Sequence, residues 1–147
     1  MRAGDGACAA AVSMVAAGFI GLPFLATGAP PRGDPVVGER VYARCIACHS
    51  PDRNRTGPLH CGLFGRVSGT APAYDFSAAL REAAITWNAE TLDAFLKAPL
   101  EAVPGTTMGF AGVADDGERR DLIAYLKMLN AASEACGSAA ASNALES

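Results

Sequence analysis

Two cysteines and a histidine in the segment Cys45-Ile46-Ala47-Cys48-His49 constrain this chain more than any other feature of its sequence. On a helix, residues three and four positions apart lie on one face. We therefore expect both thiols and the imidazole to point in the same direction. Such a cluster can serve a disulfide, a zinc site, a redox-active dithiol or a covalently held cofactor.

The spacing C-x-x-C-H is the attachment pattern of haem c, in which both thiols bond to the haem and the imidazole binds the iron. A structural zinc site needs four ligands, normally from two such pairs, and we find no second pair. A thioredoxin-like dithiol expects a βαβ pattern, which is also missing. A plain disulfide leaves His49 without a role. The motif therefore predicts one haem c, bound through Cys45 and Cys48, with His49 as an iron ligand.

The N-terminal region has the layout of a secretory signal peptide. Residues 7–26 are apolar and uncharged, Arg2 precedes them, and small residues follow at 26–29. We expect a signal peptide over 1–29 and a Pro/Gly linker over 30–35. The alternative is an uncleaved membrane anchor, because about 20 apolar residues can span a bilayer. Either way the domain is expected in the periplasm, where unprotected thiols tend to pair.

The charge of the chain argues against nucleic acid as a partner. The formal net charge is −3, from 12 basic and 15 acidic residues. Loss of residues 1–29 removes Arg2 and Asp5, which leaves 11 basic and 14 acidic residues. The remaining sequence has no basic tail or stripe, which nucleic-acid binding usually requires.

The pattern along the chain predicts an all-α domain over 36–130, followed by a tail over 131–147 that is mobile apart from the region of Cys136. Helix signals are Asp34 with Pro35, a short apolar segment at 76–83, Asn88 before a helix that ends ahead of Pro99, and Asp115 with Glu118 before a last helix. Two long loops, 50–73 and 99–113, separate these helices. Loops of this length are unusual in a compact domain, unless they wrap around a group that is not protein.

Five segments in order resemble the class I cytochromes c, mono-haem proteins of the bacterial cytochrome c and c2 type. The resemblance runs from about Gly38 to Lys127. The segments are GERVYARCIACHS, TGPLHCGLFGR (56–66), ITWN (85–88), VPGTTMGFAGV (103–113) and DLIAYLK (121–127). The resemblance implies the class I cytochrome c fold, with three to four helices and long loops around one haem.

The resemblance also implies how the iron is held. Met108 matches the sixth ligand, so that His49 and Met108 together would bind the iron. Histidine and methionine ligation raises the reduction potential. Pro58 matches the residue whose carbonyl accepts the N–H of the ligating histidine, a bond that fixes the orientation of the ring.

Four more residues acquire roles by the same resemblance. Arg66 and Trp87 match groups that hydrogen-bond a haem propionate, which needs charge-assisted partners when buried. Phe110 matches the aromatic residue that covers the haem beside the methionine. Gly38 matches the small residue where the first and last helices cross.

The sequence departs from the family pattern at several positions. Phe76 and Phe95 stand where tyrosines often hydrogen-bond a propionate and the methionine sulfur, and Tyr74 is a candidate substitute for the first. His60 stands where the family often has a leucine. We interpret His60 as a loop residue packed at the haem edge, with replacement of Met108 in a misfolded or alkaline form as the alternative.

Two cysteines remain beyond those of the haem motif. In the family fold, the Gly-Pro loop passes near the end of the last helix, and this resemblance places Cys61 close to Cys136. We predict a disulfide between them, with two free thiols as the alternative.

A haem whose two axial positions are both filled by protein exchanges single electrons. The resemblance thus implies a soluble one-electron carrier, not an enzyme, in an exported respiratory or dehydrogenase-linked chain. We expect a monomer that docks transiently with membrane or periplasmic redox proteins, such as a dehydrogenase, a cytochrome complex or an oxidase. The alternative is a haem peroxidase or gas-binding sensor in which Met108 is labile.

Overall fold

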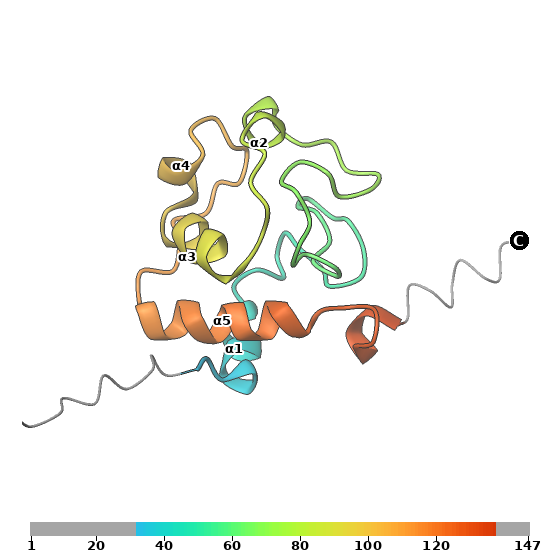
Figure 1. The fold of residues 1–147 in the computed structure, drawn as a ribbon, viewed down its shortest axis with the longest axis vertical. Coiled ribbons are helices and arrows are strands. Elements are labelled where there is room, and N and C mark those ends of the chain that lie inside the picture. Colours follow the sequence, from blue (N-terminus) through green and yellow to red (C-terminus); the bar gives the residue numbers. More distant parts are fainter. Residues whose placement is uncertain (1–31, 138–147) are drawn as a thin grey trace, which may run out of the picture. The chain divides into compact units, whose positions relative to one another are not determined.

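The computed structural model describes residues 32–137, and residues 1–31 and 138–147 lie outside this description. The expected signal peptide, the first two residues of the linker and the end of the tail fall on undescribed residues. The chain divides into two units, 1–30 and 31–147, and the second contains all of the described structure (Figure 1). No helix within residues 32–137 is long and apolar enough to cross a membrane.

The described residues form five labelled helices and a further helical turn over 134–137, all joined by loops, which confirms the all-α prediction. The helices are α1 (Pro35–Tyr42), α2 (Ala78–Glu82), α3 (Ala89–Lys97), α4 (Pro99–Ala102) and α5 (Asp116–Met128). The pairing typical of a sheet is limited, within 32–137, to one isolated antiparallel bridge between Val67 and Thr86.

Helices α1 and α5 pack directly on each other at Gly38 (Figure 1). A Cβ atom added to Gly38 would lie 2.0 Å from the Asp121 carbonyl oxygen and 2.9 Å from Tyr125 Cβ. Only glycine fits such an approach without displacement of one backbone. The expected crossing of the first and last helices is therefore confirmed.

The helix starts follow the capping signals in the sequence. The Asp34 carboxylate accepts hydrogen bonds from Val36 and Val37, and Pro35 occupies the first turn of α1. Asn88 caps α3 in the same way, in a reciprocal capping box with Thr91. Asp115 accepts from the Glu118 amide at α5. The Glu118 carboxylate does not reach back to Asp115, however, because it binds Arg44.

Two local predictions were wrong. Residues 99–113 are not entirely loop, because Pro99 both ends α3 and opens the short helix α4, where its fixed φ suits the first position. The regular part of α1 ends at Tyr42, ahead of the C-x-x-C-H motif. Residues 43–48 continue as turns, in which the Cys45 and Cys48 amides donate to carbonyls three residues earlier.

Candidate haem site

One cavity of about 230 Å³ lies between the loop that follows α1, helix α3 and the loop that precedes α5. All eight residues predicted to bind the cofactor line it: Cys45, Cys48, His49, Pro58, Arg66, Trp87, Met108 and Phe110. Most of the remaining lining is apolar. The folding of the chain therefore brings together residues that are up to 65 positions apart in sequence.

His49 is buried and held in one tautomer. Its Nδ1 lies 2.8 Å from the Pro58 carbonyl oxygen, which can only accept, so Nδ1 carries the proton. The lone pair of Nε2 is then available to a metal. Burial lowers the pKa of His49, although the Pro58 carbonyl acts in the opposite direction. The imidazole is thus neutral, the form that binds iron.

Gly57 provides the space for this ring. A Cβ atom at Gly57 would lie 2.5 Å from His49 Cε1 and 2.7 Å from its Nδ1. The Gly57 amide also donates to the Cys48 carbonyl at 2.7 Å. The loop consequently lies flat against the imidazole.

The two motif cysteines form no disulfide and line the same cavity. Cys45 is half-buried, and burial raises its pKa to about 11, whereas Cys48 is exposed. Within residues 32–137, no group of three or more His, Cys, Asp or Glu side chains is placed to hold a metal ion. Two thiols and one free imidazole nitrogen on an apolar cavity fit a covalent haem better than a zinc ion.

Met108 lies in the loop between α4 and α5 and packs, partly buried, against the core. Its amide approaches Thr106 Oγ1 at 3.3 Å, and its carbonyl accepts from the Phe110 amide at 2.9 Å. Met108 and His49 thus reach one cavity from separate segments. Their roles as the two axial ligands stay a prediction.

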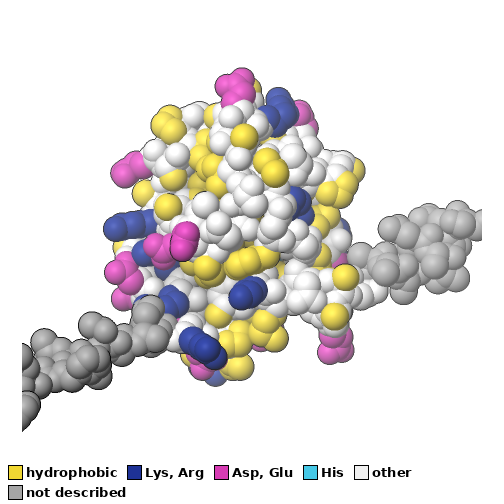
Figure 2. Space-filling view, viewed as in Figure 1, with side chains coloured by type: hydrophobic (Ala, Val, Ile, Leu, Met, Phe, Trp, Pro, Cys, Tyr) yellow, Lys and Arg dark blue, Asp and Glu magenta, His cyan; other side chains and the backbone are white. Residues whose placement is uncertain are grey.

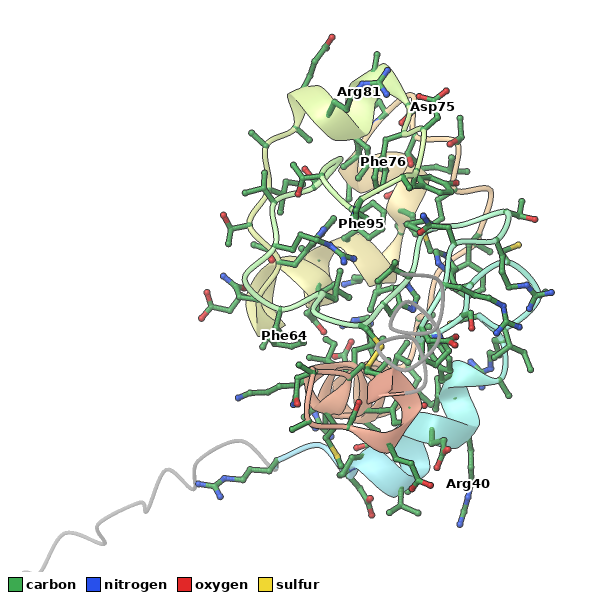
Figure 3. All side chains as sticks on the ribbon, turned by 90° about the vertical axis from the view of Figure 1, so that its right-hand side faces the viewer. Arg40, Phe64, Asp75, Phe76, Arg81 and Phe95 are labelled. Carbon is green, nitrogen blue, oxygen red and sulfur yellow. A yellow bond between two sulfur atoms is a disulfide. The ribbon has the colours of Figure 1, made fainter. Side chains whose placement is uncertain are left out.

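Aromatic side chains form much of the wall. Trp87 packs on Phe95 with ring centroids 5.1 Å apart, and Figure 3 shows Phe76 and Phe95 within the fold. The Tyr74 hydroxyl donates to the Thr56 carbonyl, and its ring meets Phe76 edge-on. The hydroxyl proton of Tyr74 therefore already has an acceptor within the protein. This counts against Tyr74 as a substitute for a propionate-bonding tyrosine at position 76.

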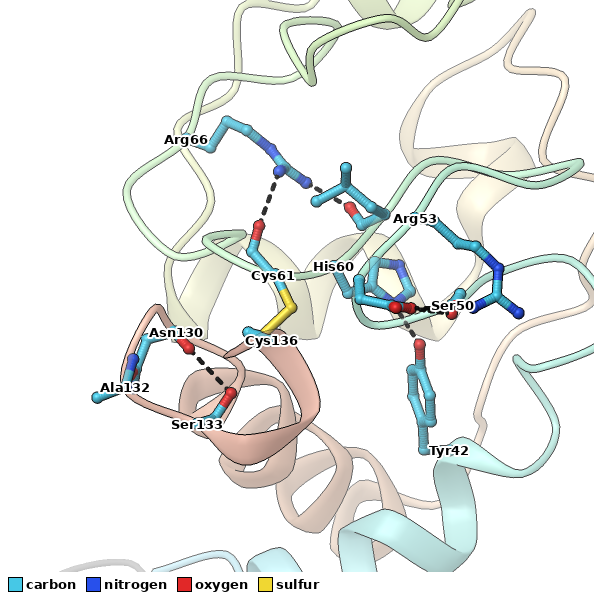
Figure 4. The surroundings of a disulfide bond; sticks show 12 residues. Tyr42, Ser50, Arg53, His60, Cys61, Arg66, Asn130, Ala132, Ser133 and Cys136 are labelled. Atoms are coloured by element: carbon cyan, nitrogen blue, oxygen red, sulfur yellow. Dashed lines mark hydrogen bonds and ion pairs between the residues drawn. A yellow bond between two sulfur atoms is a disulfide. The ribbon is translucent and has the colours of Figure 1, made fainter. Parts of the chain in front are cut away.

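Arg66 lines the cavity and also supports the Gly-Pro loop. Its guanidinium donates to the Leu59 carbonyl at 2.8 Å and to the Cys61 carbonyl at 3.2 Å (Figure 4). These two carbonyls flank His60. Contact of Arg66 with a propionate stays a prediction. The propionate would have to bind guanidinium N–H groups that do not already donate to these two carbonyls.

His60 occupies a place that the sequence interpretation missed. Its ring stacks on the His49 ring with centroids 4.2 Å apart and planes tilted by 20°. Its Nδ1 lies 3.0 Å from the Tyr42 hydroxyl (Figure 4). Burial, with contributions from His49 and Arg66, holds the pKa of His60 well below its usual value. In the native fold His60 therefore belongs to the His49 side of the site.

Cys61 and Cys136 form a disulfide, with Cα atoms 5.8 Å apart, which confirms that prediction (Figure 4). The bond joins the Gly-Pro loop to the segment after α5. The Gly62 amide donates to the Leu129 carbonyl at 2.8 Å beside it. The loop that supports His49 is consequently anchored to the C-terminal segment that follows α5.

Comparison with known proteins agrees with this geometry. The family model described as "Cytochrome c" matches residues 36–130. Cytochrome c2 of Blastochloris viridis is 41% identical over 116 residues, which cover 76% of this chain and 91% of the relative. Cytochrome c of Chlamydomonas reinhardtii is 45% identical over 105 residues, which cover 69% of this chain and 94% of the relative.

A solved structure shows the same fold. Cytochrome cH from Methylobacterium extorquens superposes with a TM-score of 0.64 at 42% identity, over 65% of this chain and 98% of that one. The all-α fold is thus that of class I cytochromes c, and the C-x-x-C-H motif holds one covalent haem c. The chain belongs to the cytochrome c family, whose members are haem-bearing electron carriers rather than enzymes.

Proposed function

We propose that this haem electron carrier is exported and works in a respiratory or dehydrogenase-linked chain, with His49 and Met108 as axial ligands. The observation that carries the proposal is that both side chains reach the same apolar cavity, beside the two motif thiols. With both positions filled from the chain, the iron has no place for a substrate. Single-electron exchange is the chemistry that such a centre supports.

The haem supplies the redox change, and the protein sets the conditions for it. The bond from His49 Nδ1 to the Pro58 carbonyl fixes the ring and makes its Nε2 a better donor. The thioether of Met108 is a soft ligand that favours reduced iron. Buried walls such as Trp87 and Phe95 keep water out, which also disfavours the more highly charged oxidised haem.

The surface supports brief docking with a redox partner. Figure 2 shows basic and acidic side chains interspersed on the face toward the viewer. Near the attachment motif, Ile46 is 51% exposed, and Arg44 is neutralised by Glu118 at 2.6 Å. A mixed surface of this kind favours a small, polar and transient interface. A periplasmic or membrane dehydrogenase, cytochrome complex or oxidase is the class of partner that we propose.

Optical spectra of the purified protein test the ligand assignment. We expect a c-type spectrum with the methionine-to-ferric-iron charge-transfer band and no change of the reduced spectrum with carbon monoxide. Met108→Ala should lose the band and bind carbon monoxide. Met128→Ala is the matched control, because Met128 is 54% exposed at the end of α5.

Carbon monoxide binding by the unaltered protein at neutral pH would instead support a peroxidase or sensor. Export is tested separately. The intact mass of periplasmic protein should correspond to cleavage near residue 29, and recovery of the full-length chain in membranes would point to an uncleaved anchor.

A further inference from the structure

His60 carries an interaction that electron transfer by a His49/Met108 haem does not itself require. The ring is packed face to face on His49 at 4.2 Å. Its backbone is held on both sides. The His60 amide lies 3.2 Å from the Ser50 carbonyl, and Arg66 bonds the carbonyls of the residues before and after it. The position of this second imidazole is therefore fixed by the fold.

The bond to Tyr42 selects one tautomer of His60. Tyr42 is only 3% exposed, and burial raises the pKa of its hydroxyl, so the phenol keeps its proton. Within residues 32–137, the His60 ring is the one hydrogen-bond partner of that hydroxyl. A phenol is a strong donor and a neutral imidazole nitrogen is a good acceptor. The Tyr42 proton is thus directed at His60 Nδ1, and the ring's own proton is placed on Nε2.

That Nε2–H group has no acceptor among the described residues. His60 lines the cavity. The one fully enclosed side-chain nitrogen or oxygen without a partner in that part of the chain is Arg120 Nε, so His60 Nε2 is not sealed inside protein. The positive end of an N–H dipole consequently lies beside the ring that we assign as the iron ligand.

We propose that His60, oriented by Tyr42, is a positioning residue that fixes the plane of His49 and raises the reduction potential of the haem. The proposal rests on the ligation by His49 described above. Stacked rings resist rotation of either partner. The oxidised haem carries one more positive charge than the reduced haem, so a nearby N–H dipole destabilises the oxidised form.

Long-range proton–nitrogen NMR of the histidine rings, recorded on the diamagnetic reduced protein, tests the tautomer directly. We expect His60 to carry its proton on Nε2, with Nδ1 shifted as a hydrogen-bond acceptor. Tyr42→Phe should remove that shift and mix the two tautomers. A protonated Nδ1 in the unaltered protein overturns the proposal, and this readout stands even if the ligand assignment fails.

Spectroelectrochemical titration tests the effect on the haem. His60→Leu should lower the reduction potential, His60→Gln should restore part of it through its amide N–H, and Tyr42→Phe should lower it less than His60→Leu. The double variant should equal His60→Leu alone, because Tyr42 acts through His60. Tyr125→Phe is the control, since Tyr125 packs on Tyr42 at 5.1 Å without a bond to His60.

Each variant must keep the spectrum of the unaltered protein, so that a change of axial ligand is not mistaken for a change of dipole. Equal potentials in the unaltered protein, His60→Leu and Tyr42→Phe overturn the proposal and leave His60 a packing residue. Should His60→Leu fail to fold, Tyr42→Phe remains decisive, because it removes one oxygen and keeps both rings.

Discussion

His49 lies in a segment that is bonded to distant parts of the chain. Met108 lies in a loop whose hydrogen bonds near this residue join positions close in sequence. On the His49 side, the Gly57 amide bonds Cys48, and the disulfide connects Cys61 with Cys136 across 75 positions. On the Met108 side, the nearest polar contacts come from Thr106 and Phe110, two positions away.

The Met108 loop is anchored farther along, where the Val113 amide donates to the Leu96 carbonyl at 2.8 Å. Between α4 and that anchor, the hydrogen bonds of Met108 are local, although its side chain packs against the core. Regions with few long-range contacts open at lower free energy than the rest of a protein. The two proposed axial ligands therefore differ in how much of the fold must move before each is released.

Removal of the disulfide should give the largest change. Cys61→Ala/Cys136→Ala should lower the free energy of unfolding by about 4 kcal/mol, because the loop closed by the bond is long and its closure restricts the unfolded chain. Chemical denaturation of the double variant beside the unaltered protein measures this difference. A loss below about 1 kcal/mol would mean that the packing of α5 alone anchors the loop.

Gly57→Ala should destabilise the His49 side next. The added methyl meets the His49 ring at 2.5 Å, and overpacking of this kind costs about 1–3 kcal/mol. We also expect an altered spectrum, because the ring is the part that must move. Gly137→Ala is the control, since a Cβ there meets no described atom within 4 Å. Equal unfolding curves for both variants would show that the loop yields more easily than its contacts suggest.

Thr106→Val tests the local support of Met108. The substitution keeps the shape of a buried side chain and removes the acceptor of the Met108 amide, at a cost of about 1 kcal/mol. We expect partial carbon monoxide binding by the reduced protein, which the unaltered protein should lack. The neighbouring exposed Thr107→Val serves as the control. Tight retention of Met108 in both variants would remove the contrast between the two sides.

The smallest effect should come from the ion pair of Arg44 and Glu118, which fastens the attachment segment to the first turn of α5 at 2.6 Å. The hydrogen bond from Arg44 holds the pKa of Glu118 below its ordinary 4.5. A depressed carboxyl pKa contributes stability above the ordinary value, and this contribution is lost as pH falls through the lowered one. Glu118→Gln should therefore flatten the fall in stability between pH 6 and pH 3, and Arg44→Gln should do the same. A slope unchanged in both variants would show the pair to be screened by solvent.

Sequence reasoning succeeded where the signal is local or the motif is long. Asp34 and Asn88 cap helices through their own neighbouring amides, so their effect is visible in a few residues. Met108 and Trp87 could be assigned to the haem site because they lie in segments that resemble the family. This assignment did not require the course of the chain between those segments.

What sequence reasoning missed depends on how loops return in space. The stack of His60 on His49 requires the Gly-Pro loop to turn back onto the motif. The available signal was Pro58, two positions before His60, whose carbonyl was predicted to meet His49. Helix α1 ends early, at Tyr42, because the following amides bond to carbonyls three rather than four residues earlier. No particular residue type in the sequence signals this change. The short helix α4 begins at Pro99. From the sequence alone, Pro99 indicated only the end of the preceding helix.

The disulfide also determines which cysteines stay available for haem attachment. Four cysteines beyond the N-terminal segment allow three pairings, and mispairing of Cys48 with Cys61 would consume a thiol that the haem needs. In the finished fold, Cys136 occupies Cys61, while Cys45 and Cys48 open on the cavity. Because Cys61 and Cys136 are joined to each other, neither is left to pair with a motif cysteine in an oxidising compartment.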